Sequence, residues 1–205
     1  MERLEELLDK EVERYLSRVE EMDEVRSLLD GSISKETYIK FLKTFFIIED
    51  ISHRAVHRAS GRTAEGNPYL SERFMVCARG EIGHAEIALN DLRGLGVKDV
   101  DLSDAPTVAE YDEMLQEQAD KFPLGILGHS YLFENVSGLM FPKNEELDYP
   151  STFIEVHAKE DPGHSLAIKR TVRNIESDLT DVELGAIIDF TKKSGEHFIR
   201  LFESL

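Results

Sequence analysis

The spacing of apolar side chains is the feature that most limits how this chain can fold, because it keeps a helical period along its length. Apolar residues recur every three or four positions in seven segments, which is typical of amphipathic α-helices. The predicted helices run from residue 2 to about 28, from 34 beyond 56, from 71 to 95, from 103–106 to about 120, from 124 onward, from about 151 to 176 and from 180 onward. No stretch has the alternation that is typical of strands. We therefore predict an all-α fold.

Local signals set several of the helix ends. Ser34 is placed to cap the second helix, and Thr180 with Glu183 forms a capping-box pattern at the start of the last one. Pro162 and Gly163 lie inside the sixth helix, where a proline cannot donate to the carbonyl four residues back, so we expect a kink there. A chain of 205 residues fits one domain that spans residues 1–205.

Composition excludes several classes of partner. The net charge of −17 argues against nucleic acid or an anionic membrane, since both bind clustered lysine and arginine. No apolar run approaches the roughly 18 to 20 residues of a membrane span, and the charged start of the chain does not resemble a signal peptide. The one cysteine, Cys77, excludes an internal disulfide and a cysteine-based zinc site. We expect a cytoplasmic protein without a membrane or nucleic-acid partner.

Two histidines and an aspartate share one face of the sixth helix. At about 100° per residue, His157, Asp161 and His164 fall within an arc of roughly 60°. Imidazole nitrogen and carboxylate oxygen are usual donors to non-haem iron, and imidazole also suits zinc. The alternative is that they are ordinary core or surface side chains, which is how we interpret His197 near the end of the chain.

Two other helices offer donors of the same kind. Glu81 and His84 lie three residues apart on one face of the third helix, a spacing used by bundle helices to bind paired metals. Glu134 lies within the apolar fifth helix, and a buried carboxylate needs a partner. Glu49 and His53 lie at the edge of the apolar face of the second helix, and whether either joins the site is left open.

The inward polar residues together form a set of three carboxylates and three imidazoles. Such a set can hold two iron ions, with carboxylates bridging them and positions left open for dioxygen. The chain has no glycine-rich phosphate loop and no nucleophile-elbow motif, so phosphoryl transfer and serine hydrolysis lack support. The predicted metal ligands are Glu81, His84, Glu134, His157, Asp161 and His164.

The segments RGEIGHAEIALNDLRGLG, LGHSYLFENVSG and FIEVHAKEDPGH carry a family resemblance. In this order, over roughly residues 35–175, the chain resembles the haem-oxygenase-like di-iron oxidases and oxygenases, also called iron-containing redox enzymes. The resemblance implies a seven-helix haem-oxygenase-like bundle, two irons held by the six residues named above, and a second iron site that is the more labile. It also implies activation of O2 toward a small organic substrate such as a fatty acid or amino acid, with electrons from an external reductant. A homodimer is left open.

Related proteins provide the alternatives. Haem oxygenase uses a histidine of its first helix, and residues 1–52 contain none, so we expect no haem. The thiaminase-like branch needs a cysteine in the fifth helix, whereas Cys77 lies in the third. A metal-free oxidase resembling pyrroloquinoline-quinone synthase remains open, as does a helical interaction module that binds no metal. A ferritin-like iron-binding protein also remains open, because Glu49 would complete its usual order of donors.

Overall fold

A computed structural model describes residues 3–100, 106–143 and 146–205, and within these ranges the protein is helical and contains no strand. The predicted all-α fold is confirmed. The α-helices are α1 (Leu4–Glu20), α2 (Asp23–Leu29), α3 (Lys35–Thr63), α4 (Pro68–Gly80), α5 (His84–Gly94), α6 (Pro106–Lys121), α7 (Leu124–Met140), α8 (Thr152–Ile175) and α9 (Asp181–Glu203). Two short 3₁₀ helices, η2 (Phe141–Lys143) and η3 (Glu176–Asp178), follow α7 and α8.

Two of the seven predicted helices are each divided into two. The first is interrupted between α1 and α2, and the third is interrupted between α4 and α5. Glycines flank the second interruption, and Gly83 has a φ of +101°, a left-handed conformation that glycine adopts without steric cost. The predicted start of the fourth helix near Ser103 lies outside the described residues, and α6 is described from Pro106 onward.

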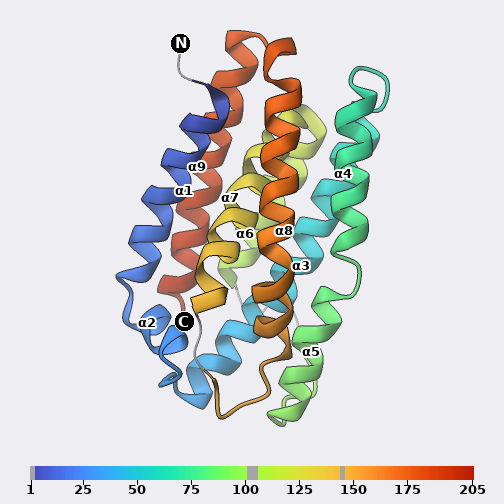
Figure 1. Cartoon of the computed structure of the whole chain (residues 1–205). Helices are drawn as coiled ribbons and strands as arrows, with labels where there is room; N and C mark the ends of the chain where they lie inside the picture. The colour runs from blue at the N-terminus through green and yellow to red at the C-terminus, as the bar shows by residue number, and fades with distance from the viewer. Residues whose placement is uncertain (1–2, 101–105, 144–145) are drawn as a thin grey trace.

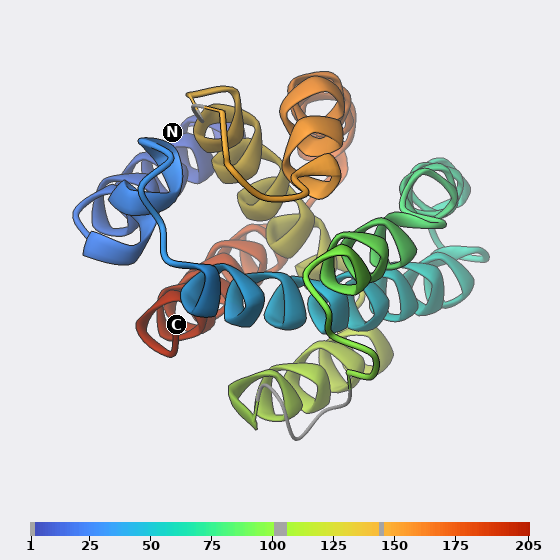
Figure 2. The same ribbon diagram turned by 90° about the horizontal axis from the view of Figure 1, so that it is seen from below.

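Helix α7 lies at the centre of the bundle, where it packs against α1, α3, α6, α8 and α9 (Figures 1 and 2). Its residues 125–132 are all buried. The sequence explains this position, because α7 is apolar on nearly all sides and such a helix is stable only when it is surrounded. The long helix α3 crosses beside it and also packs against α4, α5 and α6.

A group of aromatic rings connects α3 with η2, α8 and α9. The rings of Phe41 and Phe45 lie 4.5 Å apart between centroids, and Phe45 lies 5.8 Å from Phe153 and 5.9 Å from Phe202. These large side chains are 5 % exposed or less. Burial of each contributes about 1.5–3 kcal/mol of hydrophobic stabilisation, so the group fixes how α3 and α8 face each other.

The predicted helix caps at Ser34 and Thr180 are confirmed, whereas the helix predicted from residue 71 begins at Pro68, after the cap residue Asn67. The Ser34 side chain accepts a hydrogen bond from the Thr37 amide at 3.1 Å, and Thr180 and Glu183 cap each other reciprocally. Helix α8 continues as one element through Pro162. It approaches α7 closely, because a Cβ atom added at Gly138 would lie 3.2 Å from the Asp161 carbonyl group. A small residue is therefore needed at position 138.

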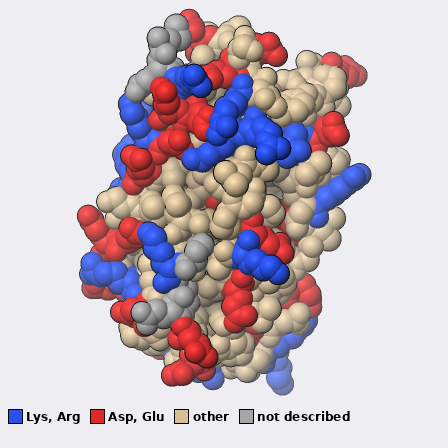
Figure 3. Space-filling model, viewed as in Figure 1, with Lys and Arg blue, Asp and Glu red and all other residues tan. Residues whose placement is uncertain are grey.

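The surface carries charges of both signs. On the face drawn in Figure 3, basic side chains form a band across the upper part with acidic side chains beside it, and the two signs alternate over the rest of the face. Many form ion pairs between helices, such as Arg173 with Glu5 at 2.6 Å and Arg58 with Asp120 at 2.8 Å. Among the helices of the described residues, none combines the length and apolar character needed to cross a membrane.

Candidate metal centre

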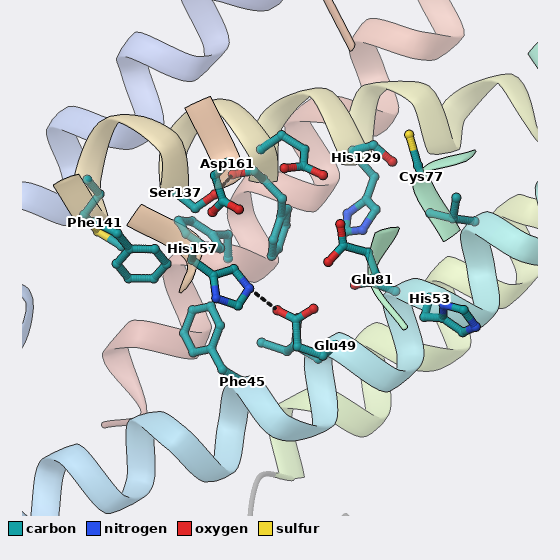
Figure 4. Close-up of a pocket in the computed structure, with 18 residues that line it drawn as sticks. Phe45, Glu49, His53, Cys77, Glu81, His129, Ser137, Phe141, His157 and Asp161 are labelled. Carbon is teal, nitrogen blue, oxygen red and sulfur yellow. Dashed lines mark hydrogen bonds and ion pairs between the residues drawn. The ribbon is translucent and has the colours of Figure 1, made fainter. Parts of the chain in front are cut away.

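All six predicted ligands lie in one region between α3, the α4–α5 turn, α7 and α8, and Figure 4 labels Glu81, His157 and Asp161 among them. Five of them fall into two groups of donor atoms close enough to hold an ion, and the groups share one carboxylate, that of Glu81. Asp161 lies beside the second group. Glu49 of α3, which the sequence left open, belongs to the first group.

The first group consists of Glu49, Glu81, His84 and His157, whose donor atoms all lie within 4.8 Å of one another. His157 Nε2 is 3.5 Å from Glu49 Oε1 (Figure 4), and the rings of His157 and His84 lie 4.7 Å apart. His84 Nδ1 is 2.8 Å from Glu81 Oε2, but the two atoms are not aligned as a hydrogen bond requires. Both histidines are 5 % exposed.

The hydrogen bonding of His157 prepares it for a metal. Its Nδ1 lies 2.7 Å from the Phe153 carbonyl oxygen, one helical turn earlier, and must donate because a carbonyl can only accept. Nε2 is therefore the nitrogen that can present a lone pair, and it points toward Glu49. Histidine ligands in proteins commonly donate their second nitrogen to a backbone carbonyl in this way.

The second group consists of Glu81, Glu134 and His164. His164 Nδ1 lies 3.3 Å from Glu134 Oε2, 3.5 Å from Glu81 Oε1 and 3.9 Å from Asp161 Oδ1. One imidazole nitrogen is thus surrounded by three carboxylates from different elements. The His164 side chain is 31 % exposed, against 7 % for His157, so the second group is nearer to solvent.

The bonding state of the donor atoms tests whether a metal fits. Four of them are buried without a hydrogen-bond partner among the described residues: His84 Nδ1, His157 Nε2, Asp161 Oδ2 and His164 Nδ1. A buried polar atom without a partner costs about 1–3 kcal/mol, and buried polar atoms in proteins normally have partners. Nitrogen and carboxylate oxygen are also the donors that iron prefers. The residues therefore fit a pair of divalent metal ions.

Charges within the site shift its pKa values strongly. Burial alone would lower the pKa of His157, but Glu49 and Asp161 raise it to about 10. Glu134 and Glu81 raise the pKa of His164 to about 9 against the effect of burial. Burial raises the pKa of Glu134 to about 7. Without a metal the imidazoles hold protons, which a bound metal must displace.

The α4–α5 turn corrects one prediction about Glu81 and His84. They were expected on one face of a continuous helix, whereas Glu81 lies in the turn and His84 is the first residue of α5. The turn still brings them together, since the His84 amide donates to the Glu81 carbonyl at 3.2 Å. The closeness of Glu81 and His84 was therefore predicted correctly, but the prediction that they share one continuous helix was wrong.

Neither donor group contains His53, His197 or Cys77. His53 is half-buried and lines the cavity, but it belongs to neither donor group. His197 stacks on Tyr111 at 5.2 Å and also lies outside both groups, in keeping with a structural role. Cys77 lies on α4 and borders the cavity, and burial raises the pKa of its thiol to about 11. A neutral thiol is a poor nucleophile.

A cavity of about 80 Å³ adjoins the donors. Apolar side chains form much of its wall, and its aromatic members are Phe45, Phe133, Phe141 and Phe198. The lining also contains a histidine that was not among the predicted site residues, His129 of α7, which is 2 % exposed. Its signal was the presence of an ionisable residue in an otherwise apolar helix, the same signal that pointed to Glu134.

Comparisons with known proteins support the fold. No protein-family model and no curated protein matches the chain. A solved TenA homologue from Pyrococcus furiosus superimposes with a TM-score of 0.83 at 16% identity, covering 98% of each chain. A domain of unknown function with a haem-oxygenase-like fold from Shewanella denitrificans gives a TM-score of 0.74 at 16% identity, covering 100% of this chain and 92% of that one. Haem oxygenase-1 from Synechocystis in complex with haem gives 0.65 at 14% identity, with the same coverage. The protein therefore has a haem-oxygenase-like fold, as predicted.

Proposed function

We propose that this protein holds two iron ions and uses them to activate O2 toward a small organic substrate. One observation supports the proposal above all others. Two groups of carboxylate and imidazole donors share Glu81, contain buried atoms without partners, and border a cavity. A merely structural cluster of charges would be expected to satisfy these atoms with hydrogen bonds.

The chain would hold one ion through Glu49, Glu81, His84 and His157. The other ion would be held by Glu81, Glu134 and His164, and Asp161 lies close enough to take part. The carboxylates of Glu49, Glu81, Glu134 and Asp161 together balance the charge of two divalent cations. Such a centre is neutral, which reduces the cost of placing it inside the protein.

Two ferrous ions can supply two electrons to O2, and an external reductant would return them to the ferrous state. The protein's part is to hold and orient the donors and to keep water from the reacting groups. The Phe153 carbonyl fixes the ring of His157, and the aromatic wall of the cavity excludes solvent. The same wall offers an apolar surface to an organic substrate.

Iron content and oxygen consumption test the proposal. Full-length protein loaded anaerobically with ferrous iron is expected to bind about two ions per chain, as measured by elemental analysis after removal of free metal. Stopped-flow absorption after mixing with O2, with and without fatty acids, amino acids and uncharged analogues of both, is expected to show a rate that depends on the organic compound. Binding of less than one iron per chain in every preparation would reject the proposal.

Iron binding without organic turnover is a second candidate function. The place of Glu49 in the first group favours it, because Glu49, the Glu81–His84 pair, Glu134 and the Asp161–His164 pair reproduce the donor order of ferritin-like bundles. The observed haem-oxygenase-like fold and the placement of His157 among the donors favour the first candidate. Slow iron oxidation that no organic compound alters would select the second.

A metal-free reaction in the same cavity would have a different signature. A metal-free oxidase resembling pyrroloquinoline-quinone synthase would keep its activity after complete removal of metal by a chelator. The buried, neutral thiol of Cys77 lies on α4 rather than on the central helix α7, which gives no support to the thiaminase-like alternative. Elemental analysis of the active protein therefore separates these reactions from the proposed one.

A further inference from the structure

His129 is a buried polar residue of the cavity that the proposed metal centre does not use. It lies on the central helix α7, is 2 % exposed, and its ring reaches into the space that Glu49 and Glu81 also border (Figure 4). Its Nδ1 lies 2.7 Å from the hydroxyl oxygen of Tyr111, which belongs to α6. Phe133, one turn further along α7, packs against the same ring at 4.6 Å between centroids. These contacts hold the imidazole in one orientation.

The bond with Tyr111 determines which nitrogen of His129 carries the proton. Tyr111 is fully buried, and its hydroxyl faces two groups, His129 Nδ1 and the buried hydroxyl of Ser194. The Ser194 hydroxyl has no other partner among the described residues, so it donates to the Tyr111 oxygen, and the Tyr111 hydrogen is left to donate to His129 Nδ1. Nδ1 is then the acceptor, and the ring proton is on Nε2. Burial lowers the pKa of His129 to about 3, so the ring remains neutral near pH 7.

The remaining surroundings indicate what the Nε2–H group could bind. It forms no hydrogen bond with any described residue, so it is free to donate to a ligand in the cavity. The described lining contains no lysine or arginine that could pair with an anionic ligand. The carboxylates of the donor groups, together with that of Asp161, already match the charge of two divalent ions. Aromatic rings from Phe45, Phe133 and Phe198 supply an apolar wall. An uncharged molecule fits these surroundings better than a carboxylate.

We propose that His129 is a substrate-positioning residue, whose Nε2–H donates to an uncharged oxygen, such as a carbonyl, on a compact apolar substrate. The role of His129 in turnover rests on the proposed function. The binding step itself needs the cavity and the His129–Tyr111 pair, and it does not need iron. Fatty acids and other free carboxylates are then poorer ligands of the cavity than their uncharged analogues.

The test uses three probes of similar shape: acetophenone, ethylbenzene and benzoate. Each is titrated into full-length protein in its metal-free form and after loading with zinc, and binding is followed by NMR chemical shifts. Acetophenone is expected to bind more tightly than benzoate in both forms. Nitrogen NMR of the histidine rings is expected to place the His129 proton on Nε2.

The double variant Tyr111→Phe/His129→Leu provides the matched control. It replaces both partners of the Tyr111–His129 hydrogen bond by apolar groups, so neither of these two residues keeps an unpaired polar atom, and only the Ser194 hydroxyl loses a contact. Acetophenone is expected to bind about 3- to 10-fold more weakly, whereas binding of ethylbenzene should change little. The single variant Tyr111→Phe keeps the His129 imidazole but removes the hydroxyl that donates to its Nδ1. It is expected to weaken the preference of the His129 proton for Nε2.

Several results would overturn the inference. In wild type, these are tighter binding of benzoate than of acetophenone, a His129 ring proton on Nδ1, or no binding of any probe. In the double variant, it is an equal loss of affinity for acetophenone and for ethylbenzene. Failure of the proposed function is distinguishable, because it appears as absent iron binding in wild-type protein. The probe titration in the metal-free form does not depend on that outcome. If the double variant does not fold, two measurements on wild type and Tyr111→Phe decide whether the inference holds. They are the nitrogen of His129 that carries the proton and the order of affinity of the three probes.

Discussion

Two polar clusters in this protein differ in how their atoms are bonded. Between α1, α7 and α8, the hydroxyl of Tyr131 donates to Asp9 at 2.6 Å, and Lys169 contacts the same carboxylate at 2.8 Å. Each group in this cluster has a partner. In the candidate metal centre, one buried atom in each of His84, His157, Asp161 and His164 has no hydrogen-bond partner among the described residues, although the three imidazole atoms lie 2.8–3.5 Å from carboxylate oxygens. The hydrogen bonds of the first cluster are complete within the protein, whereas the second cluster leaves atoms that a ligand could bind.

The largest expected effect concerns the carboxylate that the two donor groups share. Glu81→Ala should reduce bound iron from about two per chain to nearly none, because each ion loses a ligand and the two ions lose their bridge. Elemental analysis after anaerobic loading measures this. Thermal unfolding should show that iron raises the stability of wild type, by about 3–4 kcal/mol at 100 to 1,000 times the dissociation constant, and leaves the variant unchanged.

Loss of a single donor should have a narrower effect. His164→Ala removes the one imidazole of the second group and should lower iron content to about one per chain. His53→Ala and His197→Ala are matched controls that should retain full iron content, since neither residue belongs to a donor group. Equal losses from all three variants would mean that the division into ligand and structural histidines is wrong.

The dependence of stability on pH should reveal the buried, neutral His129. Its pKa is lowered to about 3 in the folded protein, below the value of about 6.5 in the unfolded chain. The folded state therefore binds fewer protons, and the stability from this group is present above pH 6.5 and lost as pH falls toward 3. Between pH 7 and pH 5 the loss should be about 2 kcal/mol.

Urea unfolding of wild type and of the Tyr111→Phe/His129→Leu variant at both pH values isolates this contribution, because other groups titrate in both proteins. The variant should show a smaller decrease. An equal decrease in the two proteins would contradict a buried neutral imidazole.

The smallest effect is expected in the complete cluster. Tyr131→Phe removes one hydrogen bond to Asp9, while Lys169 still pairs with the carboxylate. The free energy of unfolding should fall by about 1 kcal/mol, with or without iron. Iron content should remain as in wild type. A change in iron content would show that the two clusters are coupled and would remove the contrast between them.

Much of the fold could be predicted because the pattern of apolar residues reports local structure directly. The helices, the caps at Ser34 and Thr180, and the place of α7 in the core all follow from short-range features of the sequence. The break between α4 and α5 could not be predicted from periodicity, because Glu81 and His84 keep helical spacing across it. The signal was the pair of glycines at 80 and 83, which the apolar pattern concealed.

The site was less predictable where a role depends on contacts between distant segments. Five of the six predicted donors were visible through their spacing in the sequence, and Glu134 was visible as a charged residue in an apolar helix. Glu49 could not be decided, since its role depends on how α3 faces α8, and that is fixed by aromatic packing. His129 was missed because its partner Tyr111 is 18 positions away on another helix. Pairing across such distances leaves no periodic trace in one sequence.

The turn after α4 has a genetic consequence. Gly83 binds nothing itself, yet its positive φ allows the break between α4 and α5 that brings Glu81 close to His84. Any residue with a side chain at this position would cost roughly 1–2 kcal/mol in the left-handed conformation, or would shift the turn. In a screen for inactive mutants, substitutions of Gly83 should therefore appear beside substitutions of the donors. A residue can thus be essential to the site through its backbone alone.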